Sequence, residues 1–241
     1  MRLYRTSGPR LLAVCILVLL VKYEPPRVRR QNELSPNLRY IGSEYGGWWV
    51  NTAALPRRPI VYSFGLGEDT SWDEGMLDTG AHVYGFDPTP RAAEYVYKRA
   101  ELRRHANSFT YKKEGLAVEV GTVRFTLPQN PAHVSLRKGV FSNTANTLDL
   151  SVNSLPNLMK INGHVHIDIL KLDIEGAEYE VLEDLLKRQY FPFTQLLVEF
   201  HQRFEGIGEE RHDKLMIGLF HSGFVVTKRT ESNEVSFQKV L

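Results

Sequence analysis

Two glycines and an aspartate, each placed where an apolar segment ends, are the first residues whose types could do chemistry. Gly65 and Gly67 follow the apolar residues 60–64, and Asp87 follows residues 81–86. Glycine lets the backbone approach a ligand closely because it has no Cβ, and a carboxylate can accept hydrogen bonds from both hydroxyls of a ribose. The glycine pair alone would indicate only a tight strand-to-helix turn, but with Asp87 it predicts a site for an adenosine-type cofactor.

The residues after the glycine pair disfavour a nicotinamide dinucleotide. That cofactor needs the pattern G-x-G-x-x-G, with its pyrophosphate on a helix N-terminus. Here Thr70 stands at the third glycine position, and Glu68 and Asp69 occupy the turn where the phosphates would lie. Two carboxylates repel a pyrophosphate but tolerate the sulfonium and amino groups of S-adenosylmethionine. We therefore expect S-adenosylmethionine as the cofactor.

A second group of reactive residues ends two later apolar segments. Asp173 follows residues 166–172. Glu199 and His201 lie at the end of the strand expected at residues 195–200, two positions apart and so facing the same way. A hydroxyl that attacks a methyl group must lose its proton, and a carboxylate or imidazole can take it. A polar strand end that caps a neighbouring helix is the alternative, and residue type alone does not predict a metal site. The expected catalytic residues are Asp173, Glu199 and His201, and the expected cofactor-binding residues are Gly65, Gly67, Asp87 and Asp173.

The elements that must position these residues alternate in type. From residue 60 onward, short apolar strands alternate with amphipathic helices, which is typical of parallel βαβ units. Residues 166–172 are almost continuously apolar, which indicates a strand buried on both faces at the centre of the sheet. We expect a Rossmann-like α/β domain over residues 60–241 with a mostly parallel seven-stranded sheet. The expected strands are residues 60–64, 81–86, a third region at 109–111 and 116–118, 166–172, 195–200, and an antiparallel pair at 224–227 and 235–240; the expected helices are residues 69–79, 90–105, 177–188 and 209–222, and residues 123–127 predict a hairpin insertion.

One stretch of this sequence carries a family resemblance. Residues 170–182, LKLDIEGAEYEVL, resemble the signature of FkbM-type methyltransferases, and residues 147–149 and 196–201 are similar to two other elements of that family. The resemblance implies a class I methyltransferase fold, S-adenosylmethionine as methyl donor and usually an O-methyl product. Ser63 departs from the aspartate-led first strand of the family, and this region is more similar to membrane-tethered methyltransferase-like proteins of animals.

Composition limits the partners. The chain has 241 residues, enough for one substantial core, and its net charge of +2 hides an asymmetry. Residues 31–241 carry 23 basic and 27 acidic residues, a balance of −4, so the folded part offers no broad basic surface and we expect no nucleic-acid substrate. The single cysteine, Cys15, lies in an apolar segment, which excludes disulfides and thiolate metal sites from the folded part.

The N-terminal residues are typical of a targeting segment. Residues 11–21 are eleven consecutive apolar residues with basic residues on both flanks, shorter than the ~20 that span a bilayer. No small-x-small cleavage site follows them. We expect an uncleaved, single-pass signal-anchor over residues 1–22, a stem over residues 23–59 and a catalytic domain in the lumen of the secretory pathway, in the Golgi or ER; the alternative is a removed signal peptide and a secreted protein.

Two tryptophans lie behind a glycine pair within this expected stem, in residues 45–50, YGGWWV. We expect them to pack against the start of the domain, and a lid that closes over a ligand is the alternative.

These observations predict an S-adenosylmethionine-dependent methyltransferase that acts on a hydroxyl of a glycan or a small metabolite. A nicotinamide-dependent oxidoreductase and a non-catalytic binding protein of the same fold are the alternatives. The sequence predicts no oligomeric state.

Overall fold

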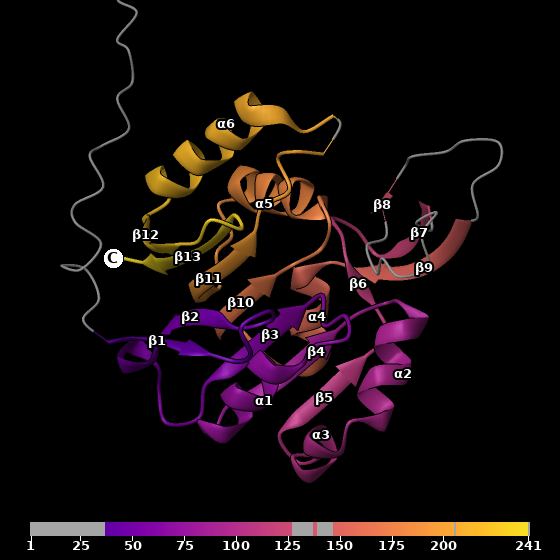
Figure 1. Ribbon diagram of the computed structural model, residues 1–241. Coiled ribbons are helices and arrows are strands. Elements are labelled where there is room, and N and C mark those ends of the chain that lie inside the picture. The colour runs from indigo at the N-terminus through magenta and orange to yellow at the C-terminus, as the bar shows by residue number, and fades with distance from the viewer. Residues whose placement is uncertain (1–36, 127–136, 139–146, 205, 241) are drawn as a thin grey trace, which may run out of the picture.

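The computed structural model of the chain describes residues 37–126, 137–138, 147–204 and 206–240 (Figure 1). The expected anchor at residues 1–22 and the first part of the expected stem lie outside the described residues. Among the helices of the described ranges, none is long and apolar enough to cross a bilayer.

A seven-stranded sheet forms the centre of the molecule, in the order β12-β13-β11-β10-β3-β4-β5. The strands from β11 to β5 are parallel to one another, and β13 is antiparallel to both β11 and β12. This confirms the expected mostly parallel seven-stranded sheet and its antiparallel end. The strands are β3 (Ile60–Phe64), β4 (His82–Phe86), β5 (Phe109–Lys112), β10 (Ile167–Leu172), β11 (Phe193–Glu199), β12 (Phe224–Arg229) and β13 (Glu234–Lys239).

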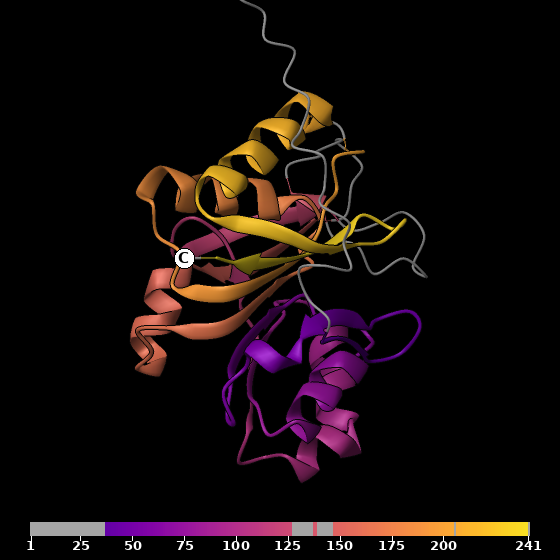
Figure 2. The same ribbon diagram turned by 90° about the vertical axis from the view of Figure 1, so that its left-hand side faces the viewer.

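Helices cover both faces of the sheet, and each face has its own apolar core (Figure 2). On the central strand, Leu170 and Leu172 pack towards α4, α5 and α6, while Ile169 packs on the opposite face with side chains of α1, α2 and α3. The alternation follows from the two-residue period of a strand, and it explains why the segment reads as continuously apolar. The helices are α1 (Ser71–Asp78), α2 (Pro90–Lys98), α3 (Ala100–Arg104), α4 (Leu155–Asn162), α5 (Ala177–Arg188) and α6 (Gly208–His221).

The expected helix at residues 90–105 is two helices. Arg99 interrupts it with an extended backbone, φ −72° and ψ 112°, between α2 and α3. Its guanidinium binds both carboxylate oxygens of Glu74 on α1, at 2.6 and 2.8 Å. This bidentate contact between distant segments accompanies a break that local helix propensity does not reveal.

A second, four-stranded sheet lies beside the domain, at the right of Figure 1, in the order β6-β9-β7-β8. Its strands are β6 (Gly115–Leu116), β7 (Gly121–Thr126), β8 (Arg137–Lys138) and β9 (Thr147–Asn153). Residues 116–118 were expected in the third strand region of the main sheet. Instead, Leu116 lies in β6, which pairs with β9 through Leu116 and Asn153. The hairpin insertion expected around residues 123–127 corresponds to β7.

The described part of the expected stem is folded onto the domain. β1 (Leu38–Ile41) and β2 (Trp48–Asn51) form a hairpin, followed by the short 3-10 helix η1 (Thr52–Ala54). Trp48 and Val50 are buried in the core that contains α1. The side chain of Gln195 binds both the backbone N–H and the carbonyl of Asn51, at 3.0 and 2.9 Å. Residues 38–54 therefore belong to the folded unit, and the tryptophan segment packs against it.

Candidate functional site

A cavity of about 740 Å³ opens at the carboxyl ends of β3, β4, β10 and β11. The chain runs from β3 outwards to β4 and β5, then crosses to β10 and β11 on the other side of β3. Ligands bind in such open sheets at the point where the strand order reverses. Its wall includes the turn after β3, the ends of β4, β10 and β11, part of the β1–β2 hairpin and Glu234 of β13.

The two glycines of the turn after β3 have different tasks. Gly65 has φ +81°, and a Cβ there would lie 1.8 Å from the carbonyl oxygen of Asp173, so this glycine lets β3 and β10 pass close together. Gly67 has φ +56° and open space where a Cβ would be. It lines the cavity, so its backbone faces a ligand without obstruction.

Asp87 holds this turn in place. Its Oδ2 accepts hydrogen bonds from the backbone N–H groups of Leu66 and Gly67, at 3.1 and 3.0 Å, and its Oδ1 accepts one from Thr89 at 2.9 Å. Burial raises the pKa of Asp87, while these hydrogen bonds oppose that rise. The Thr89 hydroxyl also hydrogen-bonds to Asp87, and the Asp87 carboxylate lines the cavity.

The three expected catalytic residues are brought together. Asp173, Glu199 and His201 each offer one potential ligand atom, and these atoms lie within 4.8 Å of one another. The register of the parallel pair explains this, because Leu172 of β10 lies opposite Val198 of β11, so the residues that follow leave the sheet side by side.

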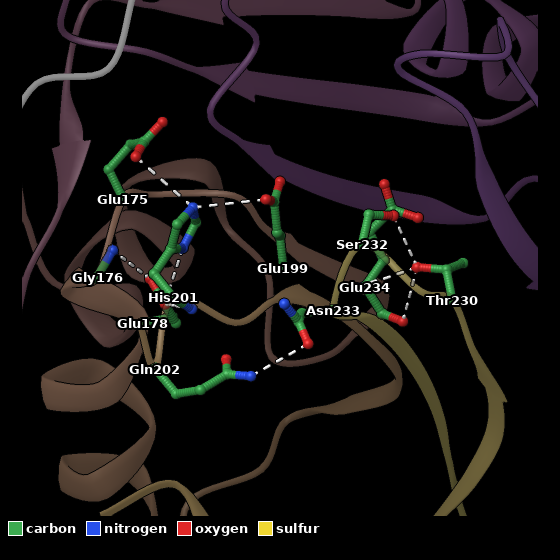
Figure 3. A network of polar contacts seen from close by, with 10 residues as sticks. All are labelled: Glu175, Gly176, Glu178, Glu199, His201, Gln202, Thr230, Ser232, Asn233 and Glu234. Carbon is green, nitrogen blue, oxygen red and sulfur yellow. Dashed lines mark hydrogen bonds and ion pairs between the residues drawn. The ribbon is translucent and has the colours of Figure 1, made fainter. Parts of the chain in front are cut away.

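His201 is held by a carboxylate that the sequence interpretation did not select. Its side chain is 2% exposed, and Glu178 Oε1 lies 3.0 Å from both its Nδ1 and its backbone nitrogen. The other ring nitrogen, Nε2, lies 3.6 Å from an oxygen of Glu175 on one side and of Glu199 on the other (Figure 3). Burial lowers the pKa of His201, but the bond to Glu178 and the surrounding carboxylates more than reverse this and raise it.

Several carboxylates lie close together around Glu199 in the wall of the cavity. Burial first, and then the charge of Asp173, raise the pKa of Glu199 to about 7. Burial, with Asp173 again contributing, also raises the pKa of Glu234. Glu234 reaches this place because it pairs with Glu199 across β13 and β11.

Lys171 is the one cationic side chain among the described residues that line the cavity, against eight carboxylates. It is not on a solvated strand edge, because β10 is central and the residue is 5% exposed. Its Nζ donates to the carbonyl of Gly65 at 2.7 Å and lies 5.6 Å from the centroid of a Trp48 ring. The cavity is therefore strongly electronegative, which suits a cationic ligand.

Sequence reasoning missed three acidic residues of this site. Glu175 and Glu178 lie within the segment that carries the family resemblance, so their spacing after Asp173 was an available signal. Glu178 also accepts from the backbone N–H of Gly176 at 2.8 Å at the start of α5, while its other oxygen contacts His201. Glu234 has no local signal, because only the antiparallel pairing of β13 places it here.

The profile of the methyltransferase FkbM domain matches residues 67–226, about two thirds of the chain. The chain belongs to the FkbM methyltransferase family. This confirms the resemblance seen in residues 170–182. The glycine turn after β3 lies at the start of the matched range, and Asp87, Asp173, Glu199 and His201 lie within it.

Two curated relatives extend the comparison of this FkbM-family chain to animals. It is 29% identical over 164 residues to "Probable methyltransferase-like protein 24" of Rattus norvegicus, covering 67% of this chain and 38% of that protein. The protein of the same name from Homo sapiens is 28% identical over the same length and coverage. The match thus spans well under half of the length of these relatives.

Two solved structures are also similar. Methyltransferase FkbM from Methylobacillus flagellatus gives a TM-score of 0.49 at 12% identity, covering 78% of this chain and 46% of that one. Fibrillarin from Aeropyrum pernix, in complex with S-adenosyl-L-methionine, gives 0.43 at 11% identity, covering 90% and 85%.

Proposed function

We propose that this FkbM-family chain is an S-adenosylmethionine-dependent methyltransferase that methylates a hydroxyl of a glycan or a small metabolite. The observation that carries the proposal is one cavity whose wall joins two chemically different groups of residues. The glycine turn and Asp87 are the first group, and Asp173 and Glu199, with the buried His201 beside them, are the second.

The described residues fit the cofactor. An electronegative wall suits a sulfonium and an amino group, the bare backbone of Gly67 allows close approach, and the Asp87 carboxylate lines the cavity beside that turn. When bound, S-adenosylmethionine supplies a methyl group on a sulfonium, and the carbon–sulfur bond breaks as the methyl passes to a nucleophile. Glu68 and Asp69, which also line the cavity, oppose the pyrophosphate of a nicotinamide cofactor.

Around Asp173 and Glu199, this chain's residues would position the acceptor and take its proton. The hydroxyl must give up a proton to a group within about 3 Å as its oxygen attacks. Asp173, Glu199 and His201 face the same space and are the candidates. Holding the acceptor in line with the methyl group would be the larger contribution of the cavity walls.

The experiment is a calorimetric titration of the chain with S-adenosylhomocysteine and, separately, with NADH. We expect binding of the first and not of the second. Asp87→Asn should weaken S-adenosylhomocysteine binding on the order of 10- to 100-fold, the scale of one or two charge-assisted hydrogen bonds. Asp78→Asn is the matched control, because Asp78 is 75% exposed and does not line the cavity.

The same approach separates binding from chemistry. Asp173→Asn and Glu199→Gln should leave S-adenosylhomocysteine affinity within a few-fold, while methyl transfer to a panel of hydroxyl acceptors falls by about 10² to 10⁴. Binding of NADH in place of S-adenosylhomocysteine would overturn the proposal in favour of an oxidoreductase, and binding without any methyl transfer would favour a binding protein.

A further inference from the structure

The imidazole of His201 is held in an orientation that suits a metal ligand as well as a proton acceptor. One ring nitrogen is fixed by Glu178 at 3.0 Å, and the side chain is 2% exposed. The other ring nitrogen points between Glu175 and Glu199, which line the cavity, with their oxygens at 3.6 Å, beyond the length of a hydrogen bond. A carboxylate behind a histidine whose free nitrogen faces other carboxylates is the arrangement that orients metal-binding histidines.

The spacing of the potential ligands also suits one ion. The atoms offered by Asp173, Glu199 and His201 lie within 4.8 Å of one another. Ligand bonds of about 2.0 to 2.2 Å place the ligand atoms around one ion about 3 to 4 Å apart. The widest separation of the three atoms is therefore at most about 1 Å greater than the upper end of the spacing around one ion.

The backbone beside this cluster is unusual as well. Glu175 has φ +53°, a left-handed conformation that a residue with a Cβ adopts at a cost. It lies between the end of β10 and α5, and this conformation brings its carboxylate to the side of His201 opposite Glu199 (Figure 3). Strained backbone of this kind concentrates at functional sites.

We propose that Asp173, Glu199 and His201 bind a divalent cation, with Glu178 as the positioning residue of His201. The cation would neutralise the crowded carboxylates and leave coordination positions open. One imidazole nitrogen with two carboxylate oxygens suits Mn²⁺ or Zn²⁺ better than Mg²⁺ or Ca²⁺, which prefer oxygen alone.

The position of the site defines the acceptor. This step rests on the proposed function, because it places the cation beside the glycine turn in the cavity of a methyltransferase. An acceptor with two neighbouring oxygens, such as a vicinal diol, would occupy two open positions at once. A bound cation would also favour loss of the acceptor's proton to water in the open cavity, so the three residues would act as ligands instead of taking the proton themselves.

The test is a titration of the full chain with Mn²⁺, followed by the loss of the electron paramagnetic resonance signal of the free ion. We expect one site per chain, displaced by Zn²⁺ more readily than by Mg²⁺. Asp173→Asn and His201→Gln should each weaken Mn²⁺ binding more than tenfold, and Glu178→Gln by about 10- to 100-fold. Glu234→Gln is the matched control, because it removes one charge from the same cavity end without removing a ligand, and it should change affinity less than about threefold.

Absence of stoichiometric Mn²⁺ binding to the wild-type chain would overturn the inference. An equal loss in Glu234→Gln and Asp173→Asn would also overturn it, because it would show diffuse attraction to an acidic surface. Neither measurement needs the methyl donor. S-adenosylhomocysteine binding without Mn²⁺ binding would overturn the cation site and leave the methyltransferase proposal standing. Mn²⁺ binding without S-adenosylhomocysteine binding would support the cation site and contradict the methyltransferase proposal.

Discussion

At the scale of single residues, Asp73 is a buried acidic group in the helix that follows the glycine turn. It lies in the first turn of α1, is 1% exposed, and its Oδ1 has no hydrogen-bond partner among the described residues. Burial raises the pKa of Asp73 to about 6 from 3.8, against the opposing charge of Lys171. A buried acid of this kind ties the stability of the fold to pH.

The sign of this effect is testable. Below pH 3.8 the carboxyl is protonated in both the folded and the unfolded chain. Between 3.8 and about 6 only the folded chain keeps the proton, so wild-type stability falls as pH rises through this window. Asp73→Asn does not titrate, so its free energy of unfolding relative to wild type should rise by about 2 kcal/mol from pH 4 to pH 7, which urea unfolding measures. A difference that stays constant over this range would contradict the assignment.

At the scale of elements, the turn between β3 and α1 combines two constraints in three residues. Gly65 is constrained by the neighbouring strand, since a Cβ there would meet the backbone of Asp173. Gly67 is constrained by its left-handed backbone, φ +56°, and by the cavity that it lines. Nothing lies within 4 Å of the position that a Cβ would take, so a side chain there would enter the cavity. One glycine thus serves the fold and the other the ligand.

A pair of alanine variants separates these roles. Gly65→Ala should lower the free energy of unfolding by at least about 3 kcal/mol, because backbone cannot move aside as a flexible side chain can. Gly67→Ala should cost only about 1 to 2 kcal/mol for its left-handed conformation, yet weaken S-adenosylhomocysteine binding because its methyl group enters the cavity. Thermal unfolding and calorimetry measure the two effects. Equal stability losses in both variants would mean that the close approach of β3 and β10 is not needed.

At the scale of the whole molecule, the cavity is closed by segments that lie far apart in sequence. The β1–β2 hairpin contributes Tyr45 and Trp48 to its wall, and β13 contributes Glu234. Tyr45 is 85% exposed at the cavity rim, while Trp48 is buried beside Lys171. The tryptophan segment therefore packs against the start of the domain and also contributes to the wall of the cavity.

The N-terminal residues carry the remaining prediction at this scale. We propose that residues 11–21 anchor the chain in a membrane, because they are continuously apolar and no cleavage site follows. The expressed chain should then stay in the membrane pellet after washing with alkaline carbonate, as detected by immunoblotting. A soluble form that begins near residues 22–30 would identify a cleaved signal peptide instead.

The sequence by itself determined the type and order of most elements and which strand ends carry the residues of the candidate site. Strands and helices follow from the local spacing of apolar residues, so β3, β4, β10, α5 and the antiparallel end were predictable, and so was the position of Gly65, Gly67 and Asp87 at strand ends. Asp173, Glu199 and His201 were predictable together because neighbouring parallel strands end at the same edge of a sheet.

Only the tertiary structure decided which distant groups meet. The pairing of β13 with β11 brings Glu234 to Glu199, and the packing of α5 brings Glu178 behind His201. Two other features also depend on contacts between distant segments: the pairing of Leu116 in the second sheet and the packing of residues 38–54 against the domain. Each depends on strand register and on burial of apolar surface between segments far apart in the chain, and the local periodicity of a sequence carries neither.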